Sequence, residues 1–188
     1  MLAVEYMLMK DPMGVRSLGL SGPFLSAPRF YADQRRYIDE RPEKIRDTIL
    51  THEASGEFSS PDYQDAMMEF YKIHVCRMDP WPDCMIRSME NLSHEVYEYM
   101  WGPSEFTMTA ILGEIDLTDR LREIHIPVLF TCGRYDESSP STTSYYQKML
   151  PDSRMVIFED ASHEHPLEKT EAYLKVVREF LRKGDGKI

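Results

Sequence analysis

The chain has 188 residues, of which 42% are hydrophobic, and it carries a net charge of −10. This composition predicts a folded globular protein with a sizeable core and excludes an intrinsically disordered chain. The acidic excess argues against a surface for nucleic acids or anionic membranes, because such surfaces need clustered Lys and Arg. Small cationic or zwitterionic substrates remain compatible with it.

The first four residues are apolar, but Glu5 and Lys10 follow closely and no basic segment precedes them. This pattern fits neither a signal peptide nor a membrane span. The cysteines are odd in number, lack the spacing of a metal site and are expected to be reduced thiols: Cys76, Cys84 and Cys132. We therefore expect a soluble, cytoplasmic protein.

The N-terminal part of the chain predicts a helix and then a strand. Residues 1–9 are expected to form the helix, and residues 15–20 a short buried strand that ends before Ser21-Gly22-Pro23. From about residue 24 to residue 123 the pattern changes to helical runs rich in charged and aromatic side chains. The predicted helices include residues 30–39, 62–77, 94–100 and 118–124.

Strands return near the C-terminus. Residues 128–131 and 155–158 are short apolar runs, and between them Ser139 is expected to cap a helix that has Pro140 at its first position. The last helix places apolar side chains on one face: Tyr173, Leu174, Val177, Phe180 and Leu181.

A helical insertion between parallel strands is the layout of an α/β hydrolase with a cap. The sequence therefore predicts an α/β fold, with a partial α/β-hydrolase core of three parallel strands and their helices, carrying a helical cap domain. The expected segments are 1–24 for the first part of the core, 25–124 for the cap and 125–188 for the rest of the core. The strand at 15–20 is expected to expose an unpaired apolar edge, so the chain needs a further segment or another partner.

Two polar residues follow the predicted strands near the C-terminus. Asp136 lies after the strand at 128–131, and His163 follows the strand at 155–158, 27 positions after Asp136. The carboxyl ends of parallel strands carry the chemistry of open α/β sheets, so this pair is expected to supply the acid and base of a Ser/Asp/His triad. His165 is the competing base.

The nucleophile of such a triad has a recognisable motif, Gly-x-Ser-x-Gly, which does not occur between Met1 and Ile188. The nearest string is Gly19-Leu20-Ser21-Gly22-Pro23. It lacks the required spacing, and its proline cannot let a strand turn sharply into a helix. The chain is thus expected to carry an acid and a base without their nucleophile.

The sequence resembles the proline iminopeptidases (prolyl aminopeptidases), serine hydrolases of the α/β-hydrolase superfamily. Matching strings are Met1-Leu2-Ala3-Val4-Glu5-Tyr6, Val15-Arg16-Ser17-Leu18-Gly19-Leu20-Ser21, Trp101-Gly102-Pro103-Ser104-Glu105-Phe106-Thr107 and Gly133-Arg134-Tyr135-Asp136-Glu137. The resemblance implies that Met1 lies one residue past the nucleophile elbow and that His163, not His165, is the base. It implies release of N-terminal proline from peptides through an acyl-enzyme. It also implies that the N-terminal half of the enzyme is missing from this chain or that self-association replaces it.

The resemblance also implies a site for the free α-ammonium of the substrate. The family holds this group with acidic residues, and the matching positions are Glu105 and Glu137. An N-blocked peptide lacks the charge-assisted hydrogen bonds that such carboxylates make. Trp101, Phe106 and Tyr135 either line a pocket sized for a pyrrolidine ring or serve as ordinary packing.

Other readings stay open. The fold serves many chemistries, so an esterase, an epoxide hydrolase or a related carbon–carbon hydrolase is one alternative. A catalytically inactive fragment or binding subunit is another, since loss of a nucleophile abolishes turnover. The histidines show no metal-ligand spacing and no Gly-rich phosphate loop occurs, so we expect neither a metal nor a nucleotide cofactor.

Overall fold

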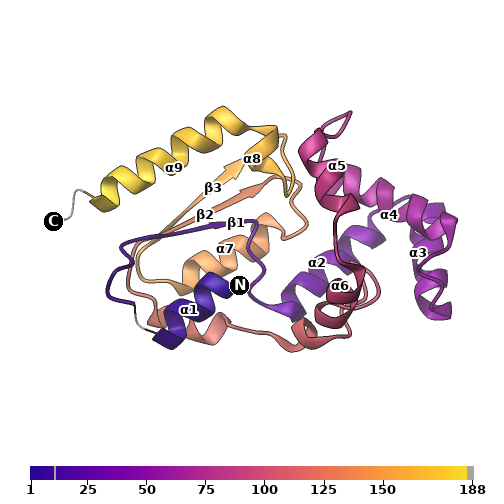
Figure 1. Ribbon diagram of the computed structural model, residues 1–188, viewed down its shortest axis with the longest axis horizontal. Coiled ribbons are helices and arrows are strands. Elements are labelled where there is room, and N and C mark those ends of the chain that lie inside the picture. Colours follow the sequence, from indigo (N-terminus) through magenta and orange to yellow (C-terminus); the bar gives the residue numbers. More distant parts are fainter. Residues whose placement is uncertain (11, 186–188) are drawn as a thin grey trace.

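A three-stranded parallel sheet forms the centre of the computed structural model, which describes residues 1–10 and 12–185 (Figure 1). Its strands are β1 (Leu18–Ser21), β2 (Val128–Gly133) and β3 (Ser153–Phe158), in the order β1-β2-β3. Ser21 lies beside Thr131, and Gly133 lies beside Phe158. The predicted α/β class with three parallel strands is confirmed.

The central strand is the most deeply buried. Every residue of β2 is buried, whereas β1 and β3 are only partly so. In the described part of the chain β1 pairs with β2 alone, which leaves its other edge open as expected. The strand begins at Leu18 and not at residue 15, because the Val15 N–H turns back to the Pro12 carbonyl and ladder bonding starts with Leu18.

Helices cover both faces of the sheet. In Figure 1, α8 (His165–Glu168) and α9 (Thr170–Asp185) lie on one side, and α1 (Leu2–Lys10) and α7 (Pro140–Met149) on the other. The predicted cap of α7 is confirmed, since Ser139 Oγ accepts a hydrogen bond from the Thr142 N–H at 3.1 Å. The core on the α7 side contains Val4, Leu20, Leu25, Leu121, Ile124, Val128, Phe130, Tyr146 and Leu150.

Helices α2 (Ala27–Asp39), α3 (Glu43–Ser55), α4 (Pro61–His74), α5 (Asp83–Glu90) and α6 (His94–Met100) gather beyond the carboxyl ends of the strands (Figure 1). This region has a core of its own: Tyr37, Ile38, Ile49, Tyr63, Ala66, Phe70, Tyr71 and Phe106. The 3₁₀ helices η1 (Ile111–Glu114) and η2 (Thr118–Glu123) lead back to the sheet, and Leu121 of η2 belongs to the core on the α7 side. The boundaries at 24/25 and 124/125 stay predictions.

Helix α4 ends at His74, three residues before the predicted end at residue 77. The N–H groups of Val75 and Cys76 both bond to the Tyr71 carbonyl, so the backbone leaves the helix there. The carbonyls of the last turn are consequently free to accept hydrogen bonds from other segments. None of the helices in the described ranges is long and apolar enough to cross a membrane.

Candidate active site

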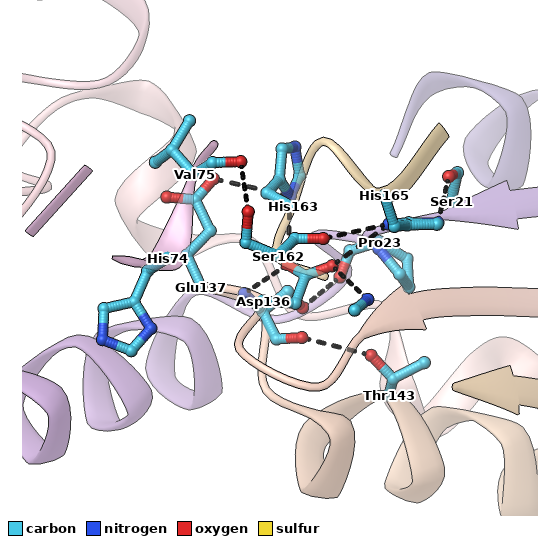
Figure 2. Close-up of polar contacts among 12 residues, drawn as sticks. Ser21, Pro23, His74, Val75, Asp136, Glu137, Thr143, Ser162, His163 and His165 are labelled. Carbon is cyan, nitrogen blue, oxygen red and sulfur yellow. Dashed lines mark hydrogen bonds and ion pairs between the residues drawn. The ribbon is translucent and has the colours of Figure 1, made fainter. Parts of the chain in front are cut away.

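Asp136 and His163 lie in contact at the carboxyl ends of neighbouring strands (Figure 2). Asp136 follows β2 and is fully buried, whereas His163 follows β3 and its side chain is 32% exposed. His163 Nδ1 lies 3.0 Å from Asp136 Oδ1, a hydrogen bond in which the imidazole N–H donates to the carboxylate. With Nδ1 engaged in this way, Nε2 is left to exchange a proton with another group.

The loop holds the Asp136 carboxylate in one orientation. Oδ1 also accepts a hydrogen bond from the Ser138 N–H at 3.0 Å, and Oδ2 accepts one from the Gly133 N–H at 3.3 Å. The hydroxyl of Tyr37, from α2, donates to the Asp136 carbonyl at 3.0 Å. A carboxylate held by N–H donors on both oxygens can orient an imidazole and stabilise its charged form.

Gly22 packs directly against the ring of His163. Its φ is +51°, and a Cβ at this position would lie 2.6 Å from both Cε1 and Nδ1 of His163. Only glycine fits this close approach without displacing the ring. The loop after β1 therefore forms one wall around the histidine.

Glu105 and Glu137 line the same cavity as His163. Glu137 is buried, and its Oε1 is 3.6 Å from His163 Nδ1, while its Oε2 has no hydrogen-bond partner among the described residues. Glu105 is partly buried and accepts a hydrogen bond from the Tyr97 hydroxyl at 3.0 Å. Burial and the neighbouring Glu105 raise the pKa of Glu137 well above its usual value. Burial also raises the pKa of Glu105, although the bond from Tyr97 opposes this.

A cavity of about 370 Å³ brings these side chains together, and its lining includes Gly22, Tyr97, Trp101, Glu105, Glu137 and His163. Of the aromatic residues weighed for a pocket, only Trp101 is in this lining. Phe106 is 1% exposed within the helical core, and the ring of Tyr135 stacks against the Arg77 guanidinium. A second cavity of about 370 Å³ shares Tyr97, Glu105 and Glu137 and extends among apolar side chains of α4 and α5.

Comparison with known proteins places this arrangement in context. The chain is 39% identical over 181 residues to a proline iminopeptidase of Heyndrickxia coagulans, a match that covers 96% of this chain and 62% of that protein. It is 36% identical to a proline iminopeptidase of Saccharolobus solfataricus, covering 96% and 58%. The resemblance to the proline iminopeptidases is confirmed. The chain spans about three-fifths of the length of these curated relatives.

Solved structures agree with the sequence relatives. The crystal structure of a proline iminopeptidase from Mycobacterium smegmatis matches with a TM-score of 0.89 and 34% identity, over 98% of this chain and 62% of the other. An esterase from Exiguobacterium antarcticum matches with a TM-score of 0.58 and 17% identity, over 96% and 62%, which shows the α/β-hydrolase fold alone. No family model matches the chain.

His165, the competing base, lies in a different environment. It is fully buried, its Nδ1 donates to the Ser162 carbonyl at 3.2 Å, and its Nε2 lies 2.9 Å from Ser21 Oγ and 3.0 Å from Thr131 Oγ1. Burial lowers its pKa. Its Nδ1 is 3.8 Å from Asp136 Oδ2, against 3.0 Å between His163 and Asp136, so the geometry favours His163 as the partner of the acid.

The charge of His163 predicts a pH dependence of stability. Burial disfavours the imidazolium, but the charges of Glu137 and Asp136 outweigh it and raise the pKa of His163 from 6.5 to about 10. The folded state thus binds the proton more tightly than the unfolded state. The stabilisation is fully present below pH 6.5 and is lost as the pH rises towards 10.

Urea unfolding of the wild type and of His163→Gln, compared at about pH 6, 8 and 10, measures this contribution. We expect the free-energy difference between the two proteins to be largest at the lowest pH and to shrink on alkalinisation. A difference that is constant or grows with pH would contradict the charged state assigned to His163.

No group of three or more His, Cys, Asp and Glu side chains within residues 1–10 and 12–185 is placed to hold a metal ion.

Proposed function

We propose that this chain provides the acid, the base and the amine-binding residues of a serine aminopeptidase that releases N-terminal proline through an acyl-enzyme. The observation that carries the proposal is the position of the Asp136–His163 hydrogen bond beside Glu105 and Glu137 at one cavity. The similarity to proline iminopeptidases supports the substrate class.

In this mechanism the nucleophile is a serine that does not belong to this chain. Its hydroxyl attacks the carbonyl carbon of the proline residue. His163 Nε2 takes the hydroxyl proton, and Asp136 stabilises the resulting imidazolium. His163 then gives that proton to the leaving amine as the peptide bond breaks. Water, deprotonated by the same imidazole, hydrolyses the acyl-enzyme and returns the serine to its starting state.

Glu105 and Glu137 serve as the binding site for the substrate ammonium. The Oε2 of Glu137 is buried and has no donor among the described residues, and an ammonium group supplies one through a charge-assisted hydrogen bond. The arriving positive charge also offsets the carboxylates that hold His163 protonated. Substrate binding is thus expected to lower the pKa of His163 and favour its basic form.

The partner in this proposal is the remaining part of the fold, or a second copy of the chain. In the relatives about two-fifths of the protein lies outside the match. The open edge of β1 and the exposed apolar side chains of α1 offer a surface for it; Leu2 is 75% and Met9 is 73% exposed. The expectation of a cytoplasmic protein belongs to this proposal as well.

Two alternatives use the same site differently. An esterase or epoxide hydrolase would need the Asp136–His163 pair but no ammonium site, so the buried Oε2 of Glu137, which has no hydrogen-bond partner among the described residues, disfavours it. An inactive fragment or binding subunit needs neither, and the missing Gly-x-Ser-x-Gly motif supports that reading.

A comparison of two proteins tests the proposal. One is the isolated chain, and the other is a fusion of the chain to the part of the Heyndrickxia coagulans proline iminopeptidase that it does not match. We expect the fusion to hydrolyse proline p-nitroanilide and the isolated chain to show no turnover, because the chain lacks a serine elbow and its oxyanion donors.

A folded fusion that cleaves p-nitrophenyl acetate but not proline p-nitroanilide would support the esterase alternative. A folded fusion inactive on both would support the inactive-fragment alternative. Turnover by the isolated chain, lost in Ser21→Ala, would instead make Ser21 the nucleophile, since its hydroxyl is already bonded to His165.

A further inference from the structure

The end of α4 is bonded to both loops of the Asp136–His163 pair. The His74 carbonyl accepts hydrogen bonds from the Glu137 N–H at 3.3 Å and from the His163 N–H at 3.0 Å. The Val75 carbonyl accepts from the Glu164 N–H and from Ser162 Oγ, both at 2.8 Å. Helix ends leave carbonyls without intrahelical partners, and here the two loops supply the missing donors. Figure 2 shows this meeting point, with the His74 ring turned away from His163.

The side chain of His74 adds a third bond to the same loops. Its Nδ1 lies 2.8 Å from the carbonyl of Tyr135, the residue before Asp136. A carbonyl only accepts, so Nδ1 carries the proton, and Nε2 has no partner among the described residues. His74 is 3% exposed, and its ring stacks on that of Tyr37 with the ring centroids 4.0 Å apart. Burial lowers the pKa of His74 to about 4, which keeps the ring neutral at physiological pH.

We infer that His74 is a positioning residue, whose Nδ1–H and carbonyl together fix the spacing between Asp136 and Glu137 on one loop and His163 on the other. The His74 carbonyl joins the two loops through the N–H groups of Glu137 and His163. The bond from His74 Nδ1–H to the Tyr135 carbonyl adds a side-chain anchor on the other flank of Asp136. Tyr37 and Gln34 of α2 also hold this loop, at the carbonyls of Asp136 and Glu137.

The inference deepens the proposed function, because it assigns a residue that sets the geometry of the same site. Its consequence is nevertheless visible without catalysis. The charge felt by His163 comes from Asp136, Glu137 and Glu164 near it and from Glu105 across the cavity. Since Asp136 and Glu137 sit on the loop that His74 holds, a displaced loop must change the titration of His163.

The test is an NMR titration of imidazole signals in the full chain, labelled with ¹³C and ¹⁵N on histidine. Two variants separate the hydrogen bond from the packing. His74→Phe keeps an aromatic ring against Tyr37 but loses the donor, whereas His74→Asn keeps an N–H donor near the Nδ1 position but loses the ring. We expect His74→Phe to lower the pKa of His163 by about one unit or more and His74→Asn to leave it near the wild-type value.

His52→Phe on helix α3 is the matched control, because the His52 ring contacts Tyr63 edge to face and its polar partners are Ser60 and Glu57, which lie outside both loops. It should leave His163 unchanged. An unaltered pKa of His163 in folded His74→Phe would overturn the inference. A lowered pKa of His163 in His74→Asn together with a wild-type pKa in His74→Phe would also overturn it, because the effect would then come from ring stacking.

A measurement on the wild type tests the inference even if the variants do not fold. The ¹⁵N shifts of His74 report its tautomer directly, and we expect a protonated Nδ1 and no titration between about pH 5 and 9. A His74 ring protonated at Nε2 alone, or titrating near its ordinary value, overturns the inference. These readouts do not depend on turnover, so an absence of peptidase activity would refute the proposed function and leave this result standing.

Discussion

Replacing His163 by alanine is expected to reduce kcat/KM for proline p-nitroanilide by a factor of about 10⁴ to 10⁶ in the fusion protein described above. The loss is large because one imidazole takes the proton from the nucleophile and then delivers it to the leaving amine. Steady-state kinetics with the purified variant measure it, and circular dichroism verifies that the fold is retained.

His125→Ala is the matched control, since His125 is exposed and lies outside the lining of the cavity. It should keep the activity of the unmodified fusion. A His163→Ala variant that retains more than about one per cent of that activity would show that another group performs the proton transfer. His165 would then be examined first, because it already contacts the hydroxyls of Ser21 and Thr131.

The second large effect concerns the glutamates. Changing Glu105 or Glu137 to glutamine removes the negative charge but keeps the shape of the side chain. We expect kcat/KM for proline amide with a free amine to fall roughly 10- to 150-fold for each change, equivalent to about 1.5–3 kcal/mol for a hydrogen bond between charged groups. Reaction with a small active-site phosphonate, which has no ammonium group, should be preserved.

The decisive comparison is between proline amide and its N-acetylated form. The unmodified fusion should prefer the free amine, and each glutamine variant should lose part of that preference. Glu95→Gln, on the exposed surface of α6, is the control for the charge change alone and should keep the preference. If Glu105→Gln and Glu137→Gln also keep it, the ammonium-binding role of these residues is wrong and the esterase alternative gains support.

Local sequence signals predicted the parts of the fold that depend on nearby residues. The run at 128–131 became the buried strand β2, and Ser139 with Pro140 began α7 as expected, because caps and apolar strands are decided within a few residues. The positions of Asp136 and His163 followed from the same logic, since each lies in the loop that follows a strand. Parallel pairing of those strands then brought the two side chains together.

Residues that act over long separations carried no such signal. His74 and Tyr37 contact the acid loop from 61 and 99 positions away, and neither belongs to a recognisable motif. The early end of α4 had no local cause visible in the sequence either. It arises because the loops after β2 and β3 supply the donors that a further helical turn would otherwise have provided. Tertiary contacts therefore decided both the helix boundary and the support of the site.

The bonds at the end of α4 also bear on how such a protein can be re-engineered. Helices α2 to α6 form a segment beside the sheet in Figure 1. Four hydrogen bonds nevertheless tie this segment to the two loops, because four loop donors bond to the carbonyls of His74 and Val75. A graft that replaces this helical segment must therefore reproduce the backbone path at residues 74 and 75 as well as the joining ends. A graft that keeps α4 through residue 75 should preserve the hydrogen bond between Asp136 and His163. A graft that brings in a helix with a different end should disrupt that hydrogen bond.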